Sequence, residues 1–145
     1  AQLEHLRLAT QLDGTLAIFD ELFSPELIAA YRFVMTEYDE RMKDPQFHAE
    51  ALENAPDPEV HLERKILRHM ERVGTLIANE LLDARVLIDY ASSYIVLNWE
   101  KLEPLVLEHR RVSNSPGLWE KFELLALKSR LVDDARAAGE GEPTS

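Results

Sequence analysis

The sequence contains no cysteine. Disulfide bonds, cysteine-ligated zinc and thiol chemistry are therefore excluded within this chain, and the redox compartment cannot be inferred from it. Long apolar runs are missing as well. The longest stretch without a charged residue, Tyr90 to Trp99, has ten residues, about half of the ~20 apolar residues that a membrane-spanning helix needs. We therefore expect a membrane attachment only through a segment upstream of Ala1.

Basic residues are scarce. Lys and Arg together number 16 against 27 Asp and Glu, which gives a formal net charge of −11. A chain of this charge repels phosphate groups, which disfavours nucleic acid as a partner. The same repulsion disfavours a purely electrostatic attachment to an anionic lipid surface. We expect neither kind of partner.

The length and composition indicate one globular domain. A chain of 145 residues has the size of a single domain and buries enough surface for a core without disulfides or metals. Hydrophobic residues make up 46% of the chain and charged residues 30%, which is ordinary for a folded soluble protein. Residues 137–145 contain two Gly, one Pro and no large apolar side chain. We therefore predict one domain over residues 1–136 and a disordered tail over 137–145.

Helical spacing dominates the chain, because apolar residues recur every three or four positions over most of it. The first such segment is a predicted amphipathic helix, and a second helix is expected from Pro25 to about Met42. The apolar stripe of the first consists of Leu3, Leu6, Leu8, Leu12, Leu16 and Phe19. Several short motifs pair a capping side chain with a proline at the first helical position, which is the usual chemistry of a helix start. These motifs are Ser24-Pro25, Asp44-Pro45, Asp57-Pro58 and Ser115-Pro116, and Asp83 predicts a further start.

Proline also marks where helices end. Pro104 lies within an apolar helical pattern, so it is expected to end or kink that helix. The Pro-rich stretch 53–58 predicts a loop between an N-terminal and a C-terminal half. No long stretch alternates apolar and polar residues, and no Asn-Gly or Asp-Gly hairpin turn occurs. The predicted fold is an all-α, single-domain bundle of about five to six helices.

Five histidines prompt a search for a metal site or a catalytic centre. His61 and His69 lie two turns apart on one predicted helix face, but Lys65 lies between them and would repel a cation. Neither Glu-x-x-His nor His-Glu-x-x-His occurs in the sequence. We therefore expect no metal site and no cofactor, and interpret the histidines as solvated or hydrogen-bonded side chains.

Arg64 and His69 match an Arg-x4-His pattern found in a class of metal-independent helical ribonucleases. With 11 Arg and five His in the chain, about one match of this kind is expected by chance. Residues five apart also lie about 140° apart around a helix, so they do not share a face. This ribonuclease is the enzymatic alternative, and we assign no catalytic residue.

Charge is unevenly distributed around residue 63. Nine acidic and two basic residues lie between Glu37 and Glu63, and a basic group follows at once. Arg64, Arg68 and Arg72 are spaced to share one helix face. The two interpretations are a solvated surface with intrahelical ion pairs, or a basic strip that docks an acidic partner or a second copy of the chain.

The C-terminal half resembles a known family. Trp99-x-x-Leu-x-Pro-x-Val-x-x-x-Arg110 and Trp119-x-x-Phe-Glu-x-Leu-Ala126 are similar to two of its segments, and Ile66 to Ile77 is similar to a helix that precedes them. The chain thus resembles the bacterial domain-of-unknown-function family 4760, mainly over residues 62–128. The resemblance implies an all-helical fold and, in many members, a membrane-spanning segment ahead of the domain. It implies no established activity and no catalytic residue.

The shared residues indicate architecture first. Trp99 and Trp119 are large side chains suited to burial, and each indole N–H needs a partner. Arg110 can reach helix-end carbonyls or an acidic side chain. If these residues instead line a binding pocket, its lining is expected to be Tyr90, Tyr94, Trp99, Arg110 and Trp119, because aromatic side chains with one charged group are typical of such sites.

These observations lead to one functional hypothesis and two alternatives. The leading hypothesis is a non-enzymatic helical module that binds a protein partner or itself, in the cytoplasm or at the cytoplasmic face of the inner membrane. The alternatives are the ribonuclease with Arg64 and His69, and a small-ligand sensor with an enclosed pocket near Trp99.

Overall fold

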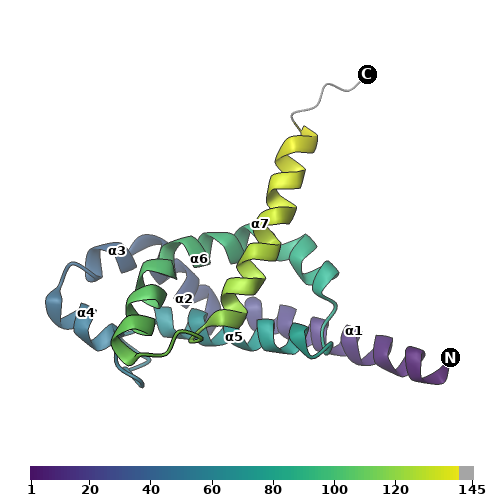
Figure 1. Ribbon diagram of the computed structural model, residues 1–145, viewed down its shortest axis with the longest axis horizontal. Coiled ribbons are helices and arrows are strands. Elements are labelled where there is room, and N and C mark those ends of the chain that lie inside the picture. The colour runs from purple at the N-terminus through teal and green to yellow at the C-terminus, as the bar shows by residue number, and fades with distance from the viewer. Residues whose placement is uncertain (141–145) are drawn as a thin grey trace.

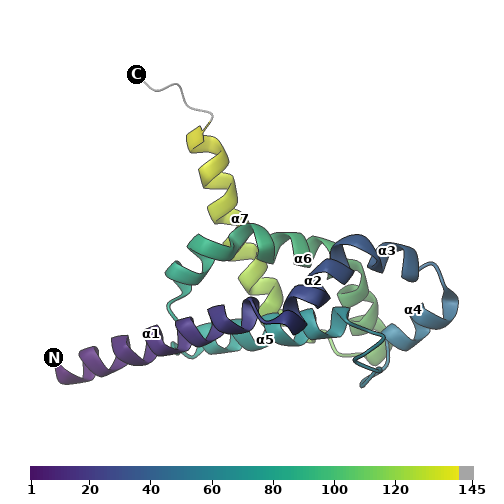
Figure 2. The ribbon, with the colours of Figure 1, turned by 180° about the vertical axis from the view of Figure 1, so that it is seen from behind.

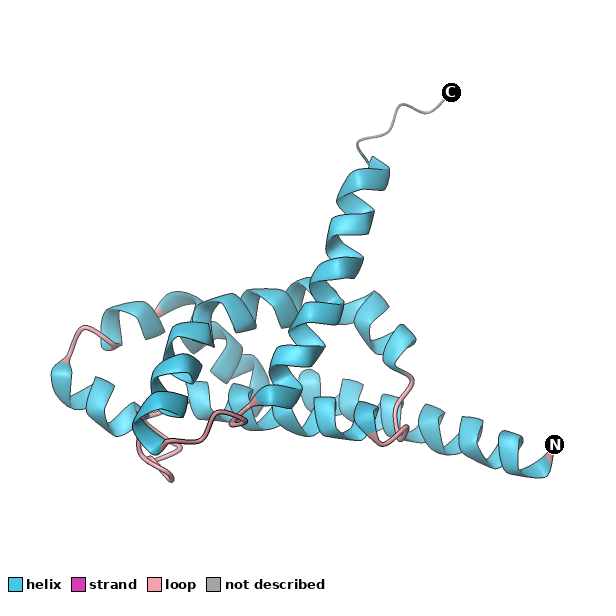
Figure 3. Cartoon of the chain, viewed as in Figure 1, coloured by secondary structure: helices cyan, strands magenta, loops and turns pink. Residues whose placement is uncertain are grey.

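The computed structural model describes residues 1–140, and over that range the chain is built from helices without a strand (Figures 1 and 3). In chain order the helices are α1 (Gln2–Leu22), α2 (Pro25–Thr36), α3 (Tyr38–Arg41), α4 (Pro45–Ala51), α5 (Glu63–Ala78), α6 (Ala84–Ser113) and α7 (Glu120–Glu140). The predicted all-α fold is confirmed. The described helices number seven rather than five to six, because the helix expected to run from Pro25 to about Met42 is divided at Glu37, whose φ of −124° leaves the helical range.

Three of the predicted helix starts are confirmed by their capping hydrogen bonds. The Ser24 hydroxyl accepts from the backbone N–H of the third residue of α2 at 3.3 Å. The Asp44 carboxylate accepts from the second residue of α4 at 3.0 Å. The Asp83 carboxylate accepts from the second and third residues of α6 at 3.1 and 3.3 Å. Each cap satisfies backbone donors that have no partner inside the helix.

The other two predicted starts are too early, by five residues for α5 and by four for α7. Asp57 caps only a turn, in which its carboxylate accepts from the Glu59 N–H at 3.0 Å, and α5 begins later, at Glu63. This turn places His61 in the interior, where its ring is fully buried. At the other site α7 begins at Glu120, because Trp119 has a φ of 61° and interrupts the helical backbone after Pro116.

Pro104 lies inside α6, which continues to Ser113. Figure 1 shows α6 running across the molecule and then turning downward in its last turns. Of the two expected effects of this proline, the kink therefore applies, because the ring removes one backbone hydrogen bond while packing against α5 and α7 keeps both halves helical.

The core lies where α7 crosses α5 and α6 (Figure 1). Trp99 of α6 packs edge-on against Phe122 of α7, with ring centroids 5.0 Å apart. Gly74 of α5 permits close approach, since a methyl group there would lie 2.5 Å from the carbonyl oxygen of Lys121. The Glu71 carboxylate accepts from the N–H groups of Lys121 and Phe122 at 3.2 and 2.8 Å. A side chain of α5 thus caps the start of α7.

Both ends of the described chain extend beyond this core (Figures 1 and 2). The first ten residues are all exposed. The second half of α1 is attached to the bundle: the Gln11 amide donates to the carbonyl oxygen of Glu80 at 3.0 Å, and the Thr15 hydroxyl accepts from the N–H of Asp83 at 3.0 Å.

The predicted disordered tail overlaps the end of α7. The helix continues to Glu140, four residues beyond the predicted domain limit of 136. The rest of the predicted tail lies outside the described residues. Within residues 1–140, no helix combines the length and the apolar character that crossing a membrane requires.

Candidate interaction surface and buried polar cluster

The structure does not bring the five candidate pocket residues together. Tyr90 packs edge-on against Phe19, with ring centroids 5.2 Å apart. Tyr94 packs against Tyr31 at 4.8 Å, and burial, with a smaller effect of Tyr31, raises the pKa of its phenol to about 12. Trp99 is buried in the core. Of these three side chains, Tyr90 and Tyr94 border one groove, whereas Trp99 lies apart from them in the core.

The other two candidates hold the connection between α6 and α7. The Arg110 Nε donates to the carbonyl oxygen of Leu118 at 2.7 Å, and its Nη2 donates to Glu123 Oε1 at 3.0 Å. Trp119 directly follows Leu118 in the chain, and its indole nitrogen is buried without a hydrogen-bond partner among the described residues. Arg110 thus fastens the loop on which Trp119 adopts its positive φ.

Trp99 lies at the edge of an open groove and not in an enclosed pocket. Its indole N–H donates to Glu103 at 2.9 Å. The groove beside it has a volume of about 240 Å³, is open to solvent, and is also lined by Glu123, Leu127 and Arg130. The sensor alternative requires an enclosed pocket near Trp99, and this groove is not one.

The predicted basic strip is interrupted at Arg64. Arg64 is almost fully buried and donates to the carbonyl oxygens of Ala51, Glu53 and Asn54 at 2.8, 2.8 and 3.1 Å. Its guanidinium carbon also lies 5.8 Å from the centre of the Trp119 ring. Burial, with a smaller effect of a neighbouring arginine, lowers the Arg64 pKa. Arg64 therefore ties the end of α4 to the start of α5 and is not available to a partner.

Arg68 and Arg72 are the exposed members of that strip. Arg72 forms an ion pair with Glu21 of α1, in which its Nη1 lies 2.6 and 2.8 Å from the two carboxylate oxygens. His69 lies beside this pair, with its Nδ1 3.3 Å from Glu21 Oε2, and burial lowers the pKa of His69. Since Arg64 contacts the end of α4 and His69 contacts α1, the two residues of the ribonuclease pattern do not converge on one site.

A buried polar cluster lies at the α4 end of the molecule. His61 is fully buried, with its Nδ1 2.7 Å from Glu63 Oε1 and its Nε2 3.1 Å from Glu50 Oε2. Phe47 of α4 stacks on the His61 ring with a centroid distance of 4.2 Å. We refer to the buried His61 and Glu63, together with the partly exposed Glu50, as the buried triad.

The geometry of the buried triad requires two shared protons. A neutral imidazole donates from one nitrogen only, whereas both nitrogens of His61 face carboxyl oxygens. Either His61 is an imidazolium that donates to both carboxylates, or one carboxyl group is protonated. Burial raises the Glu63 pKa, opposed mainly by the hydrogen bond with His61 Nδ1. The Glu50 pKa is lowered chiefly by the other hydrogen bond, with His61 Nε2. If one carboxyl group of the triad is protonated, that group is therefore Glu63.

Two further titratable groups lie near Glu63 and Arg64. Burial raises the pKa of the Tyr38 phenol, with Glu63 as the next contributor. Burial also lowers the pKa of His109, with Arg64 adding to the effect, and the His109 Nδ1 has no partner among the described residues. Such a set of perturbed groups can mark an active site. Here the imidazole of His61 is out of reach of a substrate, because it is fully buried.

Sequence reasoning missed the triad because the stretch from 37 to 63 was interpreted as a solvated acidic surface. Glu63 belongs to that stretch but is only 1% exposed. The available signal was His61-x-Glu63 immediately before an apolar helical pattern. No group of three or more His, Asp or Glu side chains in residues 1–140 is arranged to hold a metal ion.

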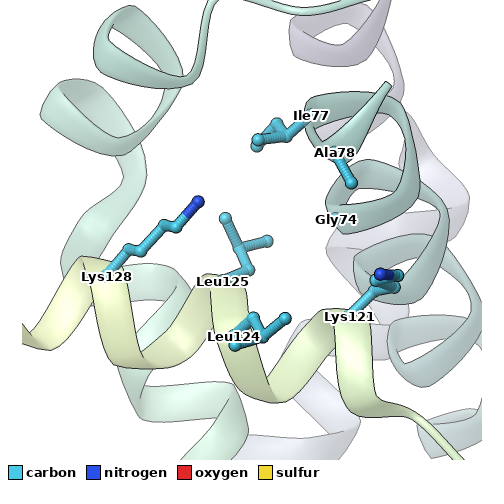
Figure 4. Close-up of a pocket in the computed structure, with 7 residues that line it drawn as sticks. All are labelled: Gly74, Ile77, Ala78, Lys121, Leu124, Leu125 and Lys128. Carbon is cyan, nitrogen blue, oxygen red and sulfur yellow. The ribbon is translucent and has the colours of Figure 1, made fainter. Parts of the chain in front are cut away.

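A small cleft separates α5 from α7 (Figure 4). Its volume is about 40 Å³, and Gly74 and Ala78 face Leu124 and Leu125 across it. This volume holds one or a few water molecules. The cleft is too small for an organic ligand.

An exposed apolar surface spans α1 and the first half of α6. Seven large apolar side chains on it are between 45% and 65% exposed. We refer to these residues as the apolar face: Leu8, Leu12 and Leu16 of α1 and Phe23 directly after it, which form the α1 row, with Val86, Tyr90 and Leu97 of α6.

Helical geometry and aromatic contacts make this face continuous. At 3.6 residues per turn, the three α1 members fall within about 80° of one another and the three α6 members within about 40°. Tyr90 joins the two rows, since Phe19 and Phe23 pack edge-on against it at 5.2 and 6.1 Å. A groove of about 230 Å³ runs beside this junction, lined by Leu22, Phe23, Tyr90, Ala91 and Tyr94. The sequence predicted α1 as an amphipathic helix, and the structure leaves much of its apolar stripe exposed.

Comparison with known proteins identifies the family. A sequence model of the family described as a domain of unknown function, DUF4760, matches residues 2–129. No curated protein and no solved structure shows a significant match to the chain. The matched range includes the tryptophan segments and also the whole N-terminal half, which the resemblance covered only loosely. The chain therefore belongs to the DUF4760 family.

Proposed function

We propose that the protein is a non-enzymatic helical module that binds another protein chain through the apolar face. The observation that carries this proposal is the exposure of seven large apolar side chains on two adjoining helices. Together they present on the order of 500 Å² of apolar surface. A standard interface buries about 800 Å² per partner, of which somewhat more than half is apolar. The apolar face therefore has the size that a specific protein interface needs.

The placement of the polar side chains supports the same proposal. Residues with perturbed pKa values, such as Glu63 and Tyr38, are buried and bonded or packed within the protein. Arg64 is engaged by three backbone carbonyls, which leaves it no free donor fork for a substrate phosphate. These polar side chains thus stabilise the fold, and the apolar face is the surface that we assign to partner binding.

The proposal extends to location as the family resemblance implies it. The domain acts in the cytoplasm or at the cytoplasmic face of the inner membrane, and any membrane attachment comes from a segment upstream of Ala1. The partner is either another protein or a second copy of the chain.

Photo-crosslinking tests this function in the native host cell. A photoreactive amino acid replaces Leu12 in the apolar face, and as a matched control it replaces Leu131, an equally exposed leucine of α7. We expect position 12 to give one defined adduct, identified by mass, and position 131 to give little. An adduct of twice the chain mass indicates self-association, and any other defined adduct indicates a partner. Equal labelling at both positions, or none at position 12, would contradict the proposal.

A further inference from the structure

We infer that the apolar face binds an amphipathic helix with basic flanks, supplied by another protein. This inference rests on the proposed function and specifies the chemistry of the partner. The α1 row of the face extends from Leu8 to Phe23, about 22 Å at 1.5 Å per residue. A partner helix of about 15 residues, with apolar side chains at every third or fourth position, matches that length.

The charges along the edge of the face indicate a basic partner. Asp13 and Asp20 lie on α1 at the edge of the apolar row opposite the buried Thr15 and Ile18. Both carboxylates are exposed, and neither has an ion-pair partner in the described part of the chain. They are seven residues apart, so they lie on the same side of the helix about 10.5 Å from each other. Lys or Arg side chains seven residues apart on a partner helix would meet both.

The acidic residues along the α6 side of the face are already paired. Asp89 accepts from Arg136 of α7 at 2.6 Å, and Glu100 lies 3.6 Å from Arg130 of α7. The carboxylates that still lack a cation therefore border the α1 row. This asymmetry predicts that the basic flank of the partner lies along α1 and not along α6.

The same charges disfavour a second copy as the occupant. A two-fold interface brings the same patch of both copies together. Asp13 and Asp20 of each copy would then border the interface, and each copy carries a net charge of −11. Like charges placed together at an interface select against that pairing. A cationic helix is attracted by the Asp13 and Asp20 carboxylates, whereas a second copy of the chain is repelled by them.

Peptide binding by fluorescence anisotropy tests this inference. The probe is a labelled 18-residue helical peptide with Leu at every third or fourth position and Lys at the flanking positions. Its counterpart has the same Leu pattern with Glu in place of Lys. We expect the Leu/Lys peptide to bind the full chain and the Leu/Glu peptide to bind at least tenfold more weakly.

Three double variants locate the contact. Leu12→Ser with Leu16→Ser removes apolar area and is expected to weaken binding at least tenfold. Asp13→Asn with Asp20→Asn removes the acidic edge and is expected to weaken binding about three- to tenfold at low salt, and to reduce its salt dependence. Glu37→Gln with Glu59→Gln makes the same charge change at exposed positions away from the face, and is expected to change binding less than twofold.

The outcomes separate the inference from the proposed function. Equal binding of the two peptides, or equal effects of the two charge variants, would overturn the basic helix as the occupant. Sedimentation across a concentration series adds a further check. A dimer that the Leu12/Leu16 variant abolishes would overturn the inference and leave the proposed function standing, whereas tight peptide binding that this variant does not weaken would overturn both.

Discussion

Replacing the buried Arg64 is the sharpest test of how polar side chains hold this fold. Arg64→Met keeps most of the side-chain volume and removes the guanidinium with its three hydrogen bonds. Ala51 is fully buried, so its carbonyl loses its partner without access to water, which costs about 1–3 kcal/mol. Glu53 and Asn54 are exposed, so their carbonyls can turn to water and add about 0.5 kcal/mol each. We expect the free energy of unfolding to fall by about 3 kcal/mol.

Urea unfolding measures this change. With a slope of about 2 kcal/mol per molar urea, a loss of 3 kcal/mol lowers the midpoint by about 1.5 M. Arg68→Met is the matched control, because Arg68 lies one turn further along α5 and is exposed. Its expected effect is within about 0.5 kcal/mol. If the two variants shifted the midpoint equally, Arg64 would not fasten α4 to α5, and the reasoning would be refuted.

Three further outcomes are expected. Burial raises the folded-state pKa of Glu63, so its contribution to stability is present below about pH 4.3 and is lost as the pH rises through the folded pKa. Glu63→Gln should therefore flatten this decline of the free energy of unfolding with pH, measured by urea unfolding. An unchanged decline would contradict this. Burial lowers the folded-state pKa of His109, so its contribution to stability is present above about pH 6.5 and is lost as the pH falls through the folded pKa. His109→Gln should reduce the loss of unfolding free energy on the acid side, by at most about 1.4 kcal/mol per pH unit. Gly74→Ala should lower the free energy of unfolding by about 2 kcal/mol or more, because the methyl group meets the α7 backbone at 2.5 Å. Gly139→Ala, which meets nothing within 4 Å, should leave stability unchanged or raise it, and equal melting temperatures of the two alanine variants would argue against the close helix contact.

Local chemistry made much of the fold predictable. Apolar spacing identified the helical class, and capping side chains located the starts of α2, α4 and α6 within a residue. The starts of α5 and α7 were placed too early for a tertiary reason. In one case the buried position of His61 favours a turn, and in the other Trp119 adopts a left-handed backbone conformation. Neither effect is contained in the spacing of nearby residues.

The candidate sites were harder to predict, because burial depends on contacts between distant segments. Arg64 belongs to a helical row with Arg68 and Arg72, and only the position of α4 determines that Arg64 is covered. Glu63 similarly belongs to an acidic run, and its burial follows from contact with His61. The apolar stripe of α1 was visible in the sequence. Periodicity cannot tell whether such a stripe packs inside the chain or stays exposed on its surface.

Hydrogen–deuterium exchange of the full chain with and without the Leu/Lys peptide tests the central claim, that the apolar face is the working surface and the buried triad is part of the scaffold. The first half of α1 has few tertiary contacts, so its amides are expected to exchange rapidly in the free protein. We predict that the peptide slows exchange in α1 and in the first half of α6, and leaves exchange in residues 50–64 unchanged. Protection confined to residues 50–64, with α1 unaffected, would contradict the account.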